Sequence, residues 1–230
     1  MRRRPEIASL CMAALCCLLI VWSAVYDFSF RRKLRSARLP ADSVYTDTIP
    51  AGPSISIYDS LVQVHADSAG LDWMLLSAVI FHESGFDNDV VSHAGTEGLM
   101  QLMPVISEKM GVEDAGDPSQ NIRAGAMYLR ELYDRFTTVV PDSLERYKFM
   151  LAAYNAGYGR VWDCIRYARY RGVDPSVWEQ IAGVLPDMAE DSVFLASGDA
   201  RLGRFSSTET VSFVRKVMKT YGKYQRSSVR

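Results

Sequence analysis

The sequence is poor in the residues that most often hold metal ions or form disulfide bonds. Its 230 residues include three histidines and four cysteines, and three of the cysteines lie within residues 7–26, which leaves Cys164 alone in the remainder. No disulfide can therefore form within residues 27–230. His82 and His93 flank Glu83, but their spacing is not the HExxH pattern of zinc proteases. We expect no metal site and no cofactor.

The sequence also lacks the motifs and the charge of several large functional classes. It has no glycine-rich phosphate loop, and Ser84-Gly85 lacks the preceding residues of a nucleophile elbow. Residues 41–230 hold 18 Lys and Arg against 25 Asp and Glu, a net charge of −7, so nucleic acid is not an expected partner. No run of alternating apolar and polar residues predicts a strand, and we expect an all-α protein.

A long apolar run stands near the N-terminus, with basic residues on both sides. Residues 7–26 carry no formal charge, and twenty such residues are long enough to span a bilayer. We expect a retained membrane anchor or signal-anchor over residues 1–35. A cleaved signal peptide is the alternative, since Val21-Trp22-Ser23 is a weak cleavage pattern. Five basic residues follow the run and three precede it, which by itself favours a C-terminal domain in the cytoplasm.

The rest of the chain divides into a tether and one helical domain. Residues 36–57 are rich in Ser, Thr, Asp and Pro, a composition typical of a flexible linker. From residue 58 onward the apolar residues recur at helical spacing, and we expect one domain over residues 58–226. The expected helices begin near residue 58 and cover residues 73–83, a short segment from residue 98 that includes Pro104, and residues 122–136, 144–155, 161–171 and 208–224. The expected helix starts are Asp72 and Asp117, and the expected stops are Gly70, Gly157 and Gly159.

Glu83 stands where a charge is unexpected. Residues 73–81 have no formal charge, and the helix predicted there is apolar almost all round, so it should be the buried centre of the domain. A carboxyl group at the end of such a helix either reaches water or is held in a less polar site. In the second case burial raises the pKa of the carboxyl and keeps its proton available near neutral pH.

Three short segments, taken in order, resemble one enzyme family. They are Glu83-Ser84-Gly85-Phe86, Gly98-Leu99-Met100-Gln101-Leu102-Met103-Pro104 and Ala153-Tyr154-Asn155-Ala156-Gly157. In this order they resemble the lytic transglycosylases of the SLT type, which share the fold of goose-type lysozyme. The resemblance covers about residues 70–225 and includes Ser92-His93-Ala94-Gly95, Asn121-Ile122, Gly125, Tyr128-Leu129 and Glu209-Thr210. The chain departs from the family pattern at Thr96, where alanine is common, and at Phe213, where tyrosine is common.

The resemblance implies cleavage of the β-1,4 bond between N-acetylmuramic acid and N-acetylglucosamine in peptidoglycan, which leaves a 1,6-anhydromuramic acid end. Most glycosidases use two carboxylates, whereas here a hydroxyl of the sugar itself attacks and one carboxyl suffices. Glu83 matches the family's catalytic acid, which gives its proton to the leaving oxygen and then takes one from the attacking hydroxyl. Asp87 and Asp89 are the candidates for a second carboxylate, although their loop position favours a solvated face.

The resemblance also assigns substrate-binding residues. Tyr154 is expected close to the catalytic carboxyl and the sugar, and Gln101 is expected to hydrogen-bond sugar hydroxyls or an N-acetyl group. Ser92 is expected either to contact the reacting sugar or to cap its own loop. Met100 is expected to line the glycan groove or to fill the core, and Asn155 to contact substrate or to shape the backbone.

Two other functions would use the same residues. A muramidase that lets water attack needs the same acid and groove, and a peptidoglycan-binding scaffold would keep the fold without the reaction. The presence of Glu83 favours an enzyme. Because glycan strands of the cell wall are the expected partner, we expect the domain outside the cytoplasmic membrane, facing the periplasm or wall, against the flanking charges. The membrane is the second expected partner, through residues 1–35, and the sequence identifies no protein partner.

Overall fold

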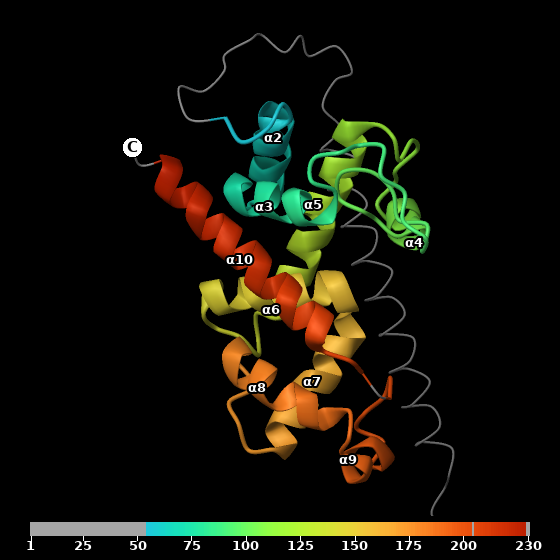
Figure 1. The fold of residues 1–230 in the computed structure, drawn as a ribbon, viewed down its shortest axis with the longest axis vertical. Coiled ribbons are helices and arrows are strands. Elements are labelled where there is room, and N and C mark those ends of the chain that lie inside the picture. Colours follow the sequence, from blue (N-terminus) through green and yellow to red (C-terminus); the bar gives the residue numbers. More distant parts are fainter. Residues whose placement is uncertain (1–53, 204, 229–230) are drawn as a thin grey trace, which may run out of the picture. The chain divides into compact units, whose positions relative to one another are not determined.

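The computed structural model describes residues 54–203 and 205–228, and these residues form helices joined by loops (Figure 1). Within this part of the chain the only extended pairings are two isolated bridges, Val91 with Glu97 and Glu97 with Leu102. The prediction of an all-α protein is therefore confirmed for the described residues. The helices are α2 (Asp59–Ala69), α3 (Trp73–Glu83), α4 (Pro104–Lys109), α5 (Pro118–Arg135), α6 (Ser143–Ala156), α7 (Tyr158–Tyr170), α8 (Trp178–Met188), α9 (Ser192–Ala196) and α10 (Thr208–Ser228).

The expected membrane span, residues 7–26, lies outside the described residues. Among the residues that are described, no helix has the length and apolar character needed to cross a membrane. The anchor predicted for residues 1–35 and most of the linker predicted for residues 36–57 therefore stay predictions.

Several helix ends follow from single residues, as the sequence predicts. Gly70 ends α2 in the left-handed conformation, with φ of 63°. The Asp72 side chain caps α3 by accepting a hydrogen bond from the Met74 amide at 2.9 Å. Asp117 caps α5 in the same way, accepting from the Gln120 amide at 2.7 Å, and Pro118 takes the first helical position, where its missing N–H costs nothing.

Helix α3 is the buried centre of the described fold. Six consecutive residues, 75–80, are buried, and this removes the middle of the helix from water on every side. Helix α10 packs across α3 and α6, while α5 packs against α2 and α6 (Figure 1). Both ends of α3 are less buried than its middle, and Glu83 is the last residue of the C-terminal end. We call the partly exposed surface around Glu83 the Glu83 opening.

The prediction of a short helix starting at Gly98 is wrong. Residues 98–101 form turns, and α4 begins only at Pro104. The reason is the backbone: Gly98 has φ of 73° and Gln101 has φ of 46°, and a right-handed helix cannot contain either value. The region left open between residues 171 and 208 contains α8 and α9.

Candidate active site

Glu83 is the last residue of α3, and its side chain is half-buried. Burial raises the pKa of its carboxyl from 4.5 to about 7, and no charged neighbour contributes to that shift. Within residues 54–203 and 205–228 its carboxyl group makes no hydrogen bond or ion pair. A half-buried carboxyl with no partner keeps its proton near neutral pH and can exchange it with a bound molecule.

The chain turns sharply directly after Glu83. Gly85 and Phe86 both have positive φ, 64° and 66°. Glycine adopts this conformation freely, whereas for phenylalanine it is strained, at a cost of about 1 to 3 kcal/mol. The ring of Phe86 packs 6.2 Å from the ring of Phe81 on α3, a contact that helps to hold the turn. The turn ends the helix abruptly and leaves the carboxyl of Glu83 at its tip.

Tyr154 on α6 lies within electrostatic range of Glu83, as the resemblance implies. Its pKa is raised well above the ordinary value, first by burial and then by Glu83 and Tyr128, so the phenol stays neutral. The phenol donates a hydrogen bond of 2.6 Å to the carbonyl oxygen of Met100. Its ring lies 5.7 Å from the ring of Tyr128 on α5. These contacts fix Tyr154 between the carboxyl and the loop before α4.

The loop before α4, residues 84–103, is held by a chain of hydrogen bonds between hydroxyl and amide groups. The hydroxyl oxygens of Ser92 and Thr96 lie 2.7 Å apart, and Thr96 Oγ1 lies 2.7 Å from Gln101 Oε1. Because an amide oxygen can only accept, the single proton of Thr96 goes to Gln101, and Ser92 donates its own to Thr96. Both N–H groups of the Gln101 amide are used as well, on the carbonyls of Val90 and Gly98 at 2.9 Å each.

Ser92 also closes its own turn, since its Oγ accepts from the amides of Ala94 and Thr96 at 3.2 and 3.1 Å. The structure thus shows the loop-capping alternative for Ser92. The donors of Gln101 are likewise engaged within the protein. Direct contact of Ser92 or Gln101 with a glycan stays a prediction. The Ser92 hydroxyl uses its proton and both lone pairs within the loop, and the Gln101 amide oxygen keeps one acceptor position.

Asn121, on the first turn of α5, joins this helix to the loop before α4. Its buried amide accepts from the backbone N–H of Met100 at 2.8 Å and donates to the carbonyls of Glu97 and Ala115 at 3.0 and 3.3 Å. A Cβ atom at Gly98 would stand 2.4 Å from Asn121 Nδ2, which no folded protein tolerates without movement. Only glycine therefore fits at residue 98.

The structure separates the two methionines of this segment. The Met100 side chain is fully buried, and a Cβ atom at Gly125 of α5 would lie 2.5 Å from its Cε. The Met100 side chain therefore takes the second of the two expected roles and fills the core instead of lining a groove. Met103, three residues later, is the exposed one, with 45% of its surface accessible.

Asn155 is exposed at the end of α6, and its Oδ1 accepts a hydrogen bond of 2.8 Å from Thr210 Oγ1 on α10. This bond ties the Tyr154 end of α6 to the first turn of α10. Contact of Asn155 with substrate stays a prediction. Its bond to Thr210 gives it a backbone-shaping role.

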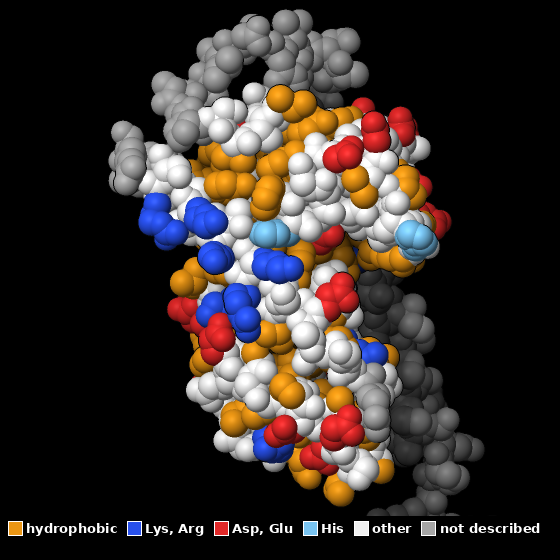
Figure 2. Space-filling view, in the orientation of Figure 1, with side chains coloured by type: hydrophobic (Ala, Val, Ile, Leu, Met, Phe, Trp, Pro, Cys, Tyr) orange, Lys and Arg blue, Asp and Glu red, His pale blue; other side chains and the backbone are white. Residues whose placement is uncertain are grey.

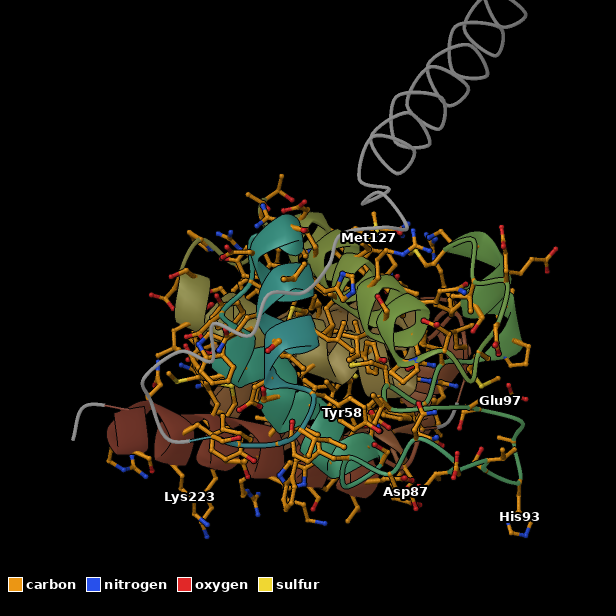
Figure 3. The ribbon with its side chains drawn as sticks, turned by 90° about the horizontal axis from the view of Figure 1, so that it is seen from above. Tyr58, Asp87, His93, Glu97, Met127 and Lys223 are labelled. Carbon is orange, nitrogen blue, oxygen red and sulfur yellow. The ribbon has the colours of Figure 1, made fainter. Side chains whose placement is uncertain are left out.

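The two loop aspartates face water. Asp87 and Asp89 are exposed, and Asp87 Oδ1 accepts the backbone N–H of Asp89 at 3.0 Å. Asp87 and His93 stand at the outer edge of the domain, with the ring of His93 pointing away from it (Figure 3). Among the described residues, no hydrogen bond or ion pair joins either aspartate to Glu83.

Three contributors to the site were given no role in it from the sequence: Tyr128, the hydroxyl of Thr96, and Asn121. Tyr128 follows the helical spacing of α5 and is indistinguishable there from a core aromatic. The departure at Thr96 was visible in the sequence, but its bonds depend on a loop whose shape was not. Asn121 would have been suspected as a buried polar residue only if the N-terminal turn of α5 had been known to lie inside the fold.

A helical fold that holds one half-buried carboxyl at the end of its central helix has the arrangement of a lysozyme-like domain. The chain belongs to the Transglycosylase SLT domain family, whose pattern matches residues 60–175. The 70 kDa soluble lytic transglycosylase SLT70 of Escherichia coli shares the fold, with a TM-score of 0.50 and 23% identity over 74% of this chain and 24% of that one.

Curated relatives are more similar in sequence. The membrane-bound lytic murein transglycosylase F of Desulfosudis oleivorans is 39% identical over 161 residues, 70% of this chain and 35% of that protein. The protein of the same name from Maricaulis maris is 37% identical over 163 residues, 70% of this chain and 34% of that protein. The chain thus spans about a third of the length of these relatives.

Proposed function

We propose that this chain is a peptidoglycan lytic transglycosylase. The observation that carries the proposal is Glu83, a half-buried carboxyl that has no partner among the described residues and whose pKa burial raises to about 7. Family membership and the names of the relatives support the same reaction class. The substrate bond is the β-1,4 link between N-acetylmuramic acid and N-acetylglucosamine.

The reaction uses Glu83 twice. The protonated carboxyl first gives its proton to the glycosidic oxygen, and the bond from that oxygen to C1 of the muramic acid breaks. The 6-hydroxyl of the same muramic acid then bonds to C1 and passes its proton to the Glu83 carboxylate, which restores the starting state. The products are an N-acetylglucosamine end and a 1,6-anhydromuramic acid end, and no water is consumed. A pKa near 7 suits both steps, because the group must give and take a proton at the same pH.

Tyr154 positions the reacting groups and stabilises developing charge. Its phenol is neutral, and its proton is donated to the Met100 carbonyl at 2.6 Å, so its oxygen can act on a bound sugar only as an acceptor. Lone pairs beside the anomeric carbon favour the oxocarbenium-like transition state of glycosidic cleavage. Ser92, Gln101 and Asn155 act mainly by shaping the walls of the site through the bonds described above.

We further propose that residues 1–35 anchor the protein in the cytoplasmic membrane, that residues 36–57 form the linker and that residues 58–226 form the catalytic domain. The charge-free run at residues 7–26 and the membrane-bound relatives support this arrangement. The catalytic domain then faces the periplasm or the wall, where peptidoglycan lies. A reporter fused after Arg230 should be active outside the cytoplasm, and activity only inside it would overturn this topology.

The test of the activity is mass spectrometry of sugars released from purified peptidoglycan by the full chain in neutral detergent, with Glu83→Gln in parallel. Anhydro products, one water lighter than reducing ones, are expected from the wild type and none from Glu83→Gln. Reducing ends lost with Glu83→Gln would identify a hydrolytic muramidase. Retention on the polymer without any release would identify a binding scaffold.

A further inference from the structure

Helix α10 has a charge opposite to that of the rest of the described domain. It contains five Lys and Arg against Glu209 alone, a net charge of +4. Residues 54–207 contain twelve Lys and Arg against twenty-two Asp and Glu, a net charge of −10. Separation of this size within one domain concentrates positive potential along a single element.

The five basic residues share one side of the helix. They are Arg215, Lys216, Lys219, Lys223 and Arg226, and all are exposed. Their spacings of four, three and one place them within about a quarter to a third of the helix circumference. Figure 2 shows Lys and Arg side chains gathered over α10, and Figure 3 shows Lys223 on the outside of this helix. We call this surface the α10 basic face.

The five cations of the α10 basic face have no ion-pair partner within the described part of the protein. None of the five forms a salt bridge or a side-chain hydrogen bond with another described residue. The aspartates near α10 lie on its other side: Tyr221 donates to Asp72 at 2.6 Å, and burial together with Asp59 raises the pKa of Tyr224. Other arginines of the domain do have such partners, for example Arg166 with Asp163 and Arg171 with Asp187.

The α10 basic face begins beside the candidate active site. His82, the neighbour of Glu83 on α3, makes a 2.9 Å hydrogen bond with Thr220 of α10. Desolvation, together with Lys216 and Lys223, lowers the pKa of His82, so its ring is neutral. The positive charge at this place therefore comes from α10. A polymer bound at Glu83 therefore passes close to the helix that carries the five cations.

We propose that the α10 basic face binds the carboxylate-bearing peptide stems of peptidoglycan while the glycan occupies the Glu83 opening. The proposal rests on the function proposed above, since it identifies a second feature of the same substrate. The peptide stems are attached to muramic acid, so their carboxylates lie beside the glycosidic bond that is cut. Exposed lysines and arginines suit such flexible acids, because they attract carboxylates over several ångström without a fixed geometry.

The structure favours acidic stems over a membrane surface. Helices that lie on membranes combine basic residues with exposed apolar side chains that enter the lipid. On α10 the large apolar residues face α3 and α6 instead, and Val214, Val217 and Tyr221 are buried. No large apolar residue within the described part of α10 is strongly exposed. Helix α10 therefore offers charge without a lipid-inserting surface of its own; the exposed ring of Phe81, in contact with His82, belongs to α3.

The test compares two pairs of substitutions in the full chain, kept in neutral detergent. Lys219→Gln with Lys223→Gln removes two charges from the α10 basic face. Arg169→Gln with Arg201→Gln removes two charges from other exposed positions and is the matched control. Binding is measured in a Glu83→Gln background by fluorescence anisotropy of labelled glycan strands, with their stems and after an amidase has removed them. Turnover of both substrates is measured with Glu83 present.

The lysine pair is expected to bind stem-bearing strands about three- to tenfold more weakly than its parent and stem-free strands equally well, with the difference lost near 1 M salt. The control pair should match the parent on both. Equal binding by all variants, or equal loss on stem-free strands, would overturn the proposal. Weaker flotation of the lysine pair with phosphatidylglycerol vesicles, without any dependence on stems, would overturn it in favour of the membrane. Absence of anhydro products together with stem-dependent binding would instead count only against the proposed activity.

Discussion

The phenol of Tyr154 donates a hydrogen bond of 2.6 Å to the carbonyl of Met100, and this bond joins α6 to the loop before α4. Because this bond uses the proton of the phenol, the phenol oxygen can only accept a hydrogen bond from a bound molecule. The proposed function therefore gives Tyr154 a chemical role besides its structural one. One substitution with two measurements tests both roles.

Tyr154→Phe keeps the ring and removes only the hydroxyl. We expect kcat to fall by about ten- to a hundredfold, because misplacement at the reacting centre has costs of this order. The free energy of unfolding should fall by only about 1 to 2 kcal/mol, the cost of one lost hydrogen bond with an unpaired buried carbonyl. Steady-state kinetics and urea unfolding measure the two effects. A loss of stability without a loss of kcat would make Tyr154 a purely structural residue.

Glu83 should make stability depend on pH in a direction opposite to that of most acids. Its folded pKa, about 7, lies above the value of 4.5 for the free group, so its contribution to folding is fully present below pH 4.5 and is lost as pH rises through 7. At pH 8 the charged carboxylate should cost up to about 2 to 3 kcal/mol. Glu83→Gln should therefore be more stable than the wild type at pH 8 and nearly equal to it at pH 4. Urea unfolding at both values checks this, and parallel pH curves would contradict it.

Thr96 should be needed for the loop that carries Gln101. Thr96→Val keeps the shape and removes the hydroxyl that connects Ser92 to Gln101 at 2.7 Å on each side. We expect a loss of about 1 to 3 kcal/mol in the free energy of unfolding and a raised KM, with Thr96→Ser close to wild type. Thermal unfolding and kinetics of the two variants form the measurement. Equal stability and equal KM of the valine and serine variants would show that the Thr96 hydroxyl contributes neither to stability nor to substrate binding.

Gly125 should resist even the smallest side chain. A Cβ atom there would meet three atoms of Met100 at 2.5 to 2.9 Å, so Gly125→Ala should destabilise the protein by about 1 to 3 kcal/mol. Gly183 on α8 is the control, because nothing lies within 4 Å of its Cβ position. Gly183→Ala should raise stability by about 0.5 to 1 kcal/mol, since alanine favours a helix over glycine. The same sign for both substitutions in denaturant unfolding would contradict the packing described here.

The local features of the fold could be predicted because they depend on neighbours in sequence. Asp72 caps α3 through the amide of Met74, two residues further along the chain. Gly70 ends α2 in the left-handed conformation, and the charge-free run before Glu83 marks a buried helix. A glutamate at the end of such a run is by itself more often a solvated side chain. The resemblance of the surrounding motifs to the SLT-type family is what selected Glu83 before the structure was known.

The walls of the site could not be predicted, because they depend on residues far apart in sequence. Met100 and Met103 look alike in the sequence, and only the packing of α5 decides which is buried. The left-handed conformation of Gln101 is unusual for a residue with a side chain and is fixed by bonds from its own amide. The bond between His82 and Thr220 spans 138 residues, so no local pattern signals it.

The central claim is that the Glu83 carboxyl is the only acid and base of the reaction and that no water attacks the sugar. Cleavage of peptidoglycan in water enriched with oxygen-18 tests this claim most directly. If the muramic acid closes its own ring, the new muramic acid ends will contain no heavy oxygen, and Glu83→Gln will release nothing. Ends that carry one heavy oxygen from the first turnovers would mean that water attacks the anomeric carbon. The account of Glu83 as the single acid and base of an internal transfer would then be wrong.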